Sequence, residues 1–67
     1  MVKINGENFD VAGMSVSEYL KTTNYQQQYI AIELNSNILP KKDYDSTILN
    51  NRDTLEIVNF VGGGWYA

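Results

Sequence analysis

The residues that could take part in chemistry form a run of glycines near the end of the sequence. Gly62, Gly63 and Gly64 follow an apolar, strand-like segment and precede Trp65. Because glycine has no Cβ atom, two consecutive glycines can pass through a channel too narrow for a side chain, and a nucleotide or nucleophile can approach their carbonyl groups closely. The alternative is a flexible chain end without a chemical role, since glycine is permissive and chain ends fray.

The composition excludes most forms of catalysis by the chain itself. The 67 residues include no cysteine and no histidine, which rules out disulfides, thiolate nucleophiles, zinc fingers and Ser-His-Asp triads. Asp43 and Asp45 in a polar stretch indicate a solvated loop, because the spacing and glycine of a calcium loop are missing. The glycine run is not a phosphate-binding loop, since neither a lysine nor a helix follows it.

Charge and hydropathy narrow the class of partner. Eight acidic residues against five basic ones give a net charge of −3, and no basic stripe is present that could neutralise nucleic-acid phosphates. No apolar run approaches the ~20 residues of a membrane span, and the first residues lack the apolar core of a signal peptide. We therefore expect a soluble cytoplasmic protein that binds neither nucleic acid nor membrane. Its acidic surface favours partners with basic docking faces.

Alternating apolar and polar residues predict the strands that must position the glycine run. The predicted strands are 1–5, 8–11, 29–34 and 54–61, with a brief edge strand at 38–39 that Pro40 ends. Asn5-Gly6, between the first two strands, is a pair favoured in type I′ hairpin turns. Polar turns are predicted at 35–37 and 50–53.

One short helix is predicted after the first hairpin. Ser15 and Glu18 match the S-x-x-E capping box, in which each side chain bonds to the backbone of the other residue. Residues at helical spacing follow: Val16, Tyr19, Leu20 and Thr23. The helix should end near Thr23 or Tyr25, because β-branched and polar residues weaken its last turn.

This order of elements predicts an α+β fold, with one main helix packed on one face of a mixed sheet of four to five strands. The last strand should lie centrally and run parallel to the first, with the helix in the crossover. The predicted core comprises Val2, Ile4, Phe9, Val11, Val16, Leu20, Ile30, Ile32, Leu34, Ile48, Leu55 and Ile57.

A single helix leaves the other face of the sheet uncovered. Val58 and Phe60 should point to that face, because they alternate with the inward-facing residues of the last strand, and Ala31 and Glu33 should join them from a neighbouring strand. An exposed apolar patch beside the glycine run is a candidate docking surface for a partner. The alternative is that Phe60 only shields the sheet.

The order of elements, the length and the Gly63-Gly64 pair after the last strand resemble the ThiS family of sulfur carriers. MoaD, the carrier of molybdopterin synthesis, is a longer relative, and ubiquitin shares the β-grasp fold. The resemblance covers essentially the whole chain and includes the segments 16–20, 38–44 and 51–53. It implies a ubiquitin-like β-grasp domain over residues 1–61 and a flexible tail over residues 62–67.

The resemblance implies a protein cosubstrate and not an enzyme. In such a carrier, an E1-like enzyme of the ThiF type uses ATP to adenylate the terminal glycine carboxylate, here that of Gly64. Sulfur from a persulfide then displaces AMP and leaves a thiocarboxylate, which donates its sulfur to a thiazole synthase of the ThiG type. The chain itself would bind no cofactor and no metal, and the ATP would be used by the partner enzyme.

The sequence departs from the family pattern after the second glycine of the pair. Carriers of this kind normally end there, whereas Gly64 is followed by Trp65, Tyr66 and Ala67. Its carbonyl is therefore an amide and cannot be adenylated until a processing protease cuts between Gly64 and Trp65. The alternatives are a MoaD-like carrier for molybdopterin, or a ubiquitin-like binding or adaptor module that is never activated and keeps Trp65 and Tyr66 as an interaction element.

Overall fold

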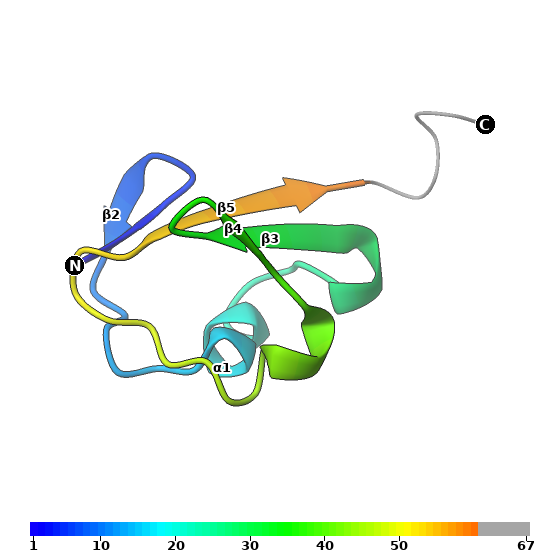
Figure 1. The fold of residues 1–67 in the computed structure, drawn as a ribbon, viewed down its shortest axis with the longest axis horizontal. Helices are drawn as coiled ribbons and strands as arrows, with labels where there is room; N and C mark the ends of the chain where they lie inside the picture. The colour runs from blue at the N-terminus through cyan, green and yellow to red at the C-terminus, as the bar shows by residue number, and fades with distance from the viewer. Residues whose placement is uncertain (61–67) are drawn as a thin grey trace.

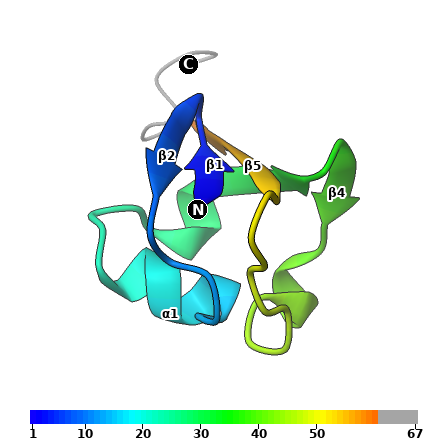
Figure 2. The same cartoon turned by 90° about the vertical axis from the view of Figure 1, so that its left-hand side faces the viewer.

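Within residues 1–60, five strands form one mixed sheet, and a single α-helix packs against one of its faces (Figures 1 and 2). The computed structural model describes residues 1–60. The elements are β1 (Val2–Ile4), β2 (Glu7–Phe9), α1 (Val16–Lys21), β3 (Ile30–Leu34), β4 (Asn37–Leu39) and β5 (Thr54–Asn59), with 3-10 turns at Gln27–Tyr29 and Lys41–Asp43. This architecture confirms the predicted α+β class.

Two tight hairpins build the edges of the sheet. Asn5 and Gly6 have φ angles of 50° and 87° between β1 and β2, which is the left-handed conformation that a type I′ turn requires at both central positions. Asn35 and Ser36 adopt φ angles of 52° and 73° between β3 and β4. The predicted turn at 35–37 is thus one residue shorter than expected, because Asn37 already pairs with Leu34 in β4.

The last strand lies in the middle of the sheet, as predicted. The strand order is β2-β1-β5-β3-β4, with β5 parallel to β1 and antiparallel to β3. A parallel pair needs a long crossover connection, and the chain between β1 and β5 carries α1 across one face of the sheet (Figure 2). No helix of the described residues covers the opposite face.

The helix is short and closed at both ends by side chains. The Glu18 N–H donates to Ser15 Oγ at 3.0 Å and the Ser15 N–H donates to Glu18 Oε1 at 2.8 Å, so the predicted capping box is present. The helix ends at Lys21, slightly earlier than expected. The hydroxyls of Thr22 and Thr23 donate to backbone carbonyls in the last turn, and such local bonds compete with continuation of the helix.

The core lies between α1 and the covered face of the sheet. It consists of Val2, Ile4, Val16, Tyr19, Leu20, Ile30, Ile32, Tyr44, Leu49, Leu55 and Ile57. Val11 and Leu34, also predicted, are partly buried against this cluster. The sequence pattern did not place Tyr19, Tyr44 and Leu49 in the core.

Two predicted core residues are wrong. Phe9 is 37% exposed, because β2 is an edge strand where its ring has a tilted contact with Tyr19 at 6.3 Å between centroids but no further strand beside it. Ile48 is 48% exposed while the adjacent Leu49 is fully buried. The Leu49 N–H donates to the Met14 carbonyl at 2.8 Å, and this bond fixes which of the two neighbouring residues faces inward.

Candidate functional site

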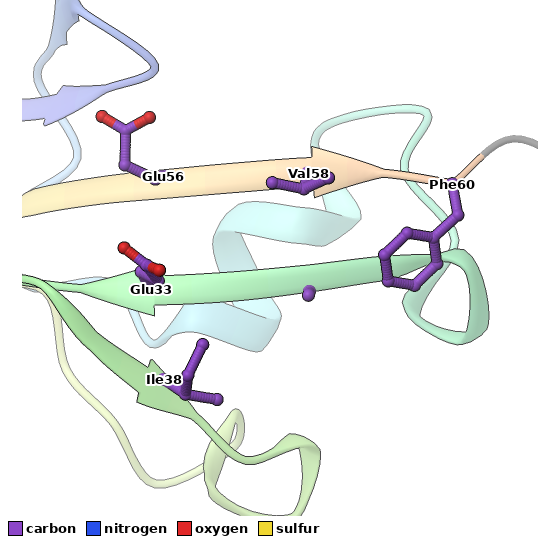
Figure 3. A pocket seen from close by; sticks show the side chains of 6 residues that line it. Glu33, Ile38, Glu56, Val58 and Phe60 are labelled. Atoms are coloured by element: carbon purple, nitrogen blue, oxygen red, sulfur yellow. The ribbon is translucent and has the colours of Figure 1, made fainter.

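The uncovered face of the sheet carries a hollow that contains the predicted docking residues. Val58 and Phe60 lie at and beyond the end of β5, and Ala31 and Glu33 lie on β3. All four line the same hollow (Figure 3). The register of the antiparallel pair places Ala31 opposite Val58, and residues directly opposite each other share a face. The structure thus brings together the residues that alternation assigned to this face.

Two further residues complete the hollow. Ile38 lies opposite Glu33 in the β3–β4 pair, and Glu56 lies opposite Glu33 in the β3–β5 pair. Ile38 is 68% exposed and Val58 is 58% exposed, which is high for large aliphatic side chains. Ile38 was predicted in an edge strand but was not assigned to this face. The position of Ile38 follows from the two-residue turn at 35–36, because this turn sets the strand register and places Ile38 opposite Glu33.

Side-chain hydrogen bonds stabilise the end of the sheet from which the chain continues toward the glycines. Figure 1 shows β3 and β5 running on beyond the β1–β2 hairpin. On one flank, the Ile57 N–H donates to Asn5 Oδ1 at 2.7 Å and Asn5 Nδ2 donates to the Ile57 carbonyl at 3.3 Å. On the other flank, Lys41 Nζ donates to the Ile30 carbonyl at 2.8 Å. These side chains satisfy backbone groups that the outer strands are too short to reach.

Phe60 marks the junction between the sheet and the glycine run. Its N–H donates to the Tyr29 carbonyl at 2.7 Å, which extends the β3–β5 pairing past the end of β5. Figure 3 shows Phe60 at one end of the hollow and the two glutamates at the other. The glycines and Trp65, at which modification and cleavage are predicted, lie outside the described residues, as does the predicted boundary between the domain and residues 62–67.

The described part of the chain contains two side chains with a perturbed pKa, and both belong to the core. Burial raises the pKa of the Tyr44 hydroxyl above its usual value of 10.0. Burial, with a smaller contribution from Tyr25, raises that of Tyr19. Over residues 1–60 no group of three or more acidic side chains is arranged to hold a metal ion. No helix in that range is long and apolar enough to cross a membrane.

The sequence model of the ThiS family matches residues 2–64. The chain belongs to the ThiS family. The match reaches Gly64 and does not include Trp65 or the residues after it.

Two ThiS proteins resemble this family member over nearly its whole length. The sulfur carrier protein ThiS of Bacillus subtilis is 30% identical over 66 residues, covering 96% of this chain and 100% of the relative. The crystal structure of the thiamine biosynthesis protein ThiS from Geobacter metallireducens superposes with a TM-score of 0.74 at 31% identity, covering 94% of this chain and 97% of that one. The predicted β-grasp fold is confirmed, and so is the prediction of a ThiS sulfur carrier of thiamine biosynthesis that is not an enzyme.

A third relative differs from this ThiS-family chain in length. The thiazole synthase of Paramagnetospirillum magneticum is 43% identical over 63 residues. The match covers 91% of this chain but only 19% of that protein. The present chain is thus similar to one segment of a much longer polypeptide.

Proposed function

We propose that this chain carries sulfur as a thiocarboxylate on Gly64 for the synthesis of the thiazole ring of thiamine. The observation that carries the proposal is the family match, which runs through both glycines of the pair and ends at Gly64. The absence of cysteine and histidine from the sequence agrees with a role in which partner enzymes supply the nucleophiles and bases.

The proposed chemistry activates a carboxylate that is otherwise unreactive. A carboxylate oxygen of Gly64 attacks the α-phosphate of ATP, pyrophosphate leaves, and an acyl-adenylate forms. The terminal sulfur of a persulfide then attacks the acyl carbon and AMP leaves. A thiol reduces the resulting acyl disulfide, and the sulfur stays on Gly64 as a thiocarboxylate. Partner enzymes carry out every step, and the chain provides the acyl group.

Gly64 must first be released from the residues that follow it. The Gly64 carbonyl is an amide to Trp65 in the sequence, and an amide has no carboxylate oxygen to attack ATP. We therefore propose that a protease removes residues 65–67. The end of the family match at residue 64 supports cleavage at this bond.

The hollow on the uncovered face is proposed as the surface on which the partners dock. It lies on the strand that leads to the glycines, and its residues Val58 and Ile38 expose apolar surface that a partner could cover. Docking there would fix the start of the glycine run relative to the active site of the partner. The run has no side chains that would prevent its entry into a narrow channel.

The proposed partners are an E1-like adenylating enzyme of the ThiF type and a thiazole synthase of the ThiG type. A segment similar to this chain occurs within a polypeptide named thiazole synthase, which supports the thiazole synthase as the acceptor of the sulfur. ATP is then a substrate of the adenylating enzyme, and the carrier needs no bound cofactor.

The proposal is tested by activation of a chain that ends at Gly64. Incubation with ATP and a ThiF-type enzyme should release pyrophosphate, and a persulfide donor should then produce a mass in which sulfur replaces one oxygen. The matched controls are the chain that retains Trp65 to Ala67 and the chain that lacks Gly64, and both should be inactive. Equal pyrophosphate release from either control would overturn the assignment of Gly64.

Cleavage is tested separately by intact-mass spectrometry of the protein from its native host. We expect a species that ends at Gly64. If cells that are actively making thiamine contain only chains that retain Trp65, the proposed processing is wrong.

A further inference from the structure

Two glutamates face each other across neighbouring strands at one end of the hollow. Glu33 on β3 is directly opposite Glu56 on β5, and both side chains are exposed. Opposite residues in an antiparallel pair have Cβ atoms about 4.5–5.5 Å apart, and like charges at such positions destabilise the sheet. Without a partner, the domain thus keeps two negative charges opposite each other, which is unfavourable for its stability.

The described part of the chain does not neutralise this pair. Within residues 1–60, neither carboxylate takes part in an ion pair. Lys41, which follows β4, directs its ammonium to the Ile30 carbonyl at 2.8 Å. Lys3 is the exposed residue of β1, but the register places it beside Thr54 and not beside Glu56.

The surroundings of the pair are apolar. Ile38 lies opposite Glu33, Val58 is the next residue of β5 on the same face, and both are more than half exposed. Figure 3 shows the two carboxylates beside these aliphatic side chains. A partner that covers Val58 and Ile38 must also remove water from the carboxylates, and this is costly unless the partner brings a positive charge.

Charge complementarity therefore specifies the partner surface. An arginine presents a planar set of donors that can reach two carboxylates at once, whereas a lysine is a single point charge. We infer that Glu33 and Glu56 together receive an arginine guanidinium from the adenylating enzyme, surrounded by apolar residues that cover Val58 and Ile38. The inference rests on the proposed function and extends it by naming the chemistry of the partner at this face.

The test uses the chain ending at Gly64 and measures pyrophosphate release by the ThiF-type enzyme against carrier concentration. A Glu33→Gln, Glu56→Gln double variant should raise KM about tenfold and leave kcat unchanged, because the charges act in docking and not at the reacting carbonyl. The matched control is a Glu7→Gln, Asp10→Asn double variant. It removes the same charge from exposed positions outside the hollow and should keep the KM of the unsubstituted chain.

Salt and thermal unfolding provide two further readouts. The KM of the unsubstituted chain should rise with sodium chloride, and that of the glutamine double variant should respond much less. The double variant should unfold at the same or a higher temperature than the unsubstituted chain, because a like-charge opposition has been removed. If the double variant has a higher KM but an unchanged or higher unfolding temperature, the two glutamates act in docking and not in folding.

The outcomes distinguish this inference from the proposed function. If the two double variants have the same KM, or if kcat falls while KM is unchanged, the arginine contact is wrong although Gly64 activation stands. If the unsubstituted chain releases no pyrophosphate, the proposed function fails, and the inference that rests on it fails too.

Discussion

At the scale of single residues, Tyr44 carries the clearest energetic conflict in the described structure. Its side chain is 1% exposed, and its hydroxyl has no hydrogen-bond partner in residues 1–60. A buried hydroxyl without a partner costs about 1–3 kcal/mol relative to one that is bonded. The ring therefore stabilises the core while its oxygen opposes folding.

Replacing Tyr44 by phenylalanine should increase the free energy of unfolding by about 1 kcal/mol, because the ring packing is kept and the unsatisfied oxygen is removed. Urea denaturation at neutral pH measures this change. The control is Tyr29→Phe, at a side chain that is 40% exposed and should show little effect. A Tyr44→Phe variant that is clearly less stable would mean that the hydroxyl has a partner.

The same substitution should change the response to alkaline pH. Burial raises the pKa of Tyr44 in the folded state above 10.0, so the unfolded chain loses this proton at a lower pH than the folded one. The corresponding stability is fully present below pH 10 and is lost as the pH rises through the folded-state pKa. The Tyr44→Phe variant should therefore lose less stability above pH 10, and Tyr19, whose pKa is also raised, should account for part of what remains.

The alternating pattern predicted burial correctly in β1, whereas the same pattern misplaced Phe9 in the edge strand β2. Val2 and Ile4 alternate with exposed neighbours, and both were predicted in the core and are buried. Tyr44 and Leu49 lie in the irregular stretch between β4 and β5, where no period indicates which side chain turns inward. Their burial depends on the path that this stretch takes past α1. The local sequence does not directly determine that path.

At the scale of elements, the ends of the central strands depend on side chains from distant parts of the chain. Asn5 was predicted as a turn residue, and its φ of 50° confirms that role. Its amide also bonds to Ile57, which is 52 residues away in sequence. That second role could not be predicted from a local pattern, because it requires β5 to lie beside β1 and to continue past the hairpin.

Two substitutions at Asn5 separate its two roles. Asn5→Gly keeps the left-handed turn and removes both bonds to Ile57, so the free energy of unfolding should fall by about 1–2 kcal/mol. For Asn5→Ala, the free energy of unfolding should fall by about 1 kcal/mol more, because alanine disfavours positive φ. Chemical denaturation measures both changes. Ser36→Gly, in the other hairpin at φ 73°, is the control and should be close to neutral. Equal stabilities of Asn5→Gly and the unsubstituted chain would show that the bonds to Ile57 contribute nothing.

At the scale of the whole molecule, the number of helices determines which surface remains for binding. One helix was predicted from a capping box and a few residues at helical spacing, and one helix cannot cover both faces of a five-stranded sheet. The outward positions of Val58 and Phe60 on the uncovered face therefore followed from the sequence. The contribution of Ile38 did not, because it depends on the β3–β4 register. The roles of Gly63 and Gly64 rest on the family match, since they lie outside the described residues.

The proposed docking face and the glycine run are separate regions, so substitutions in the two should have different kinetic effects. In the chain ending at Gly64, Val58→Asp and Phe60→Asp should raise the KM for adenylation about tenfold, because an interface centre that loses apolar contact weakens binding. Gly63→Ala should mainly lower kcat, because an added Cβ obstructs the approach to the active site of the partner.

Ile48→Asp is the matched control for this comparison. It places the same charge on an exposed aliphatic position outside the hollow, so it should leave both constants unchanged. Val58 is more than half exposed, and Val58→Asp therefore keeps the test valid even if Phe60→Asp impairs folding, which circular dichroism would reveal. If Val58→Asp behaves like Ile48→Asp, the uncovered face does not contact the adenylating enzyme, and recognition must lie in the glycine run alone.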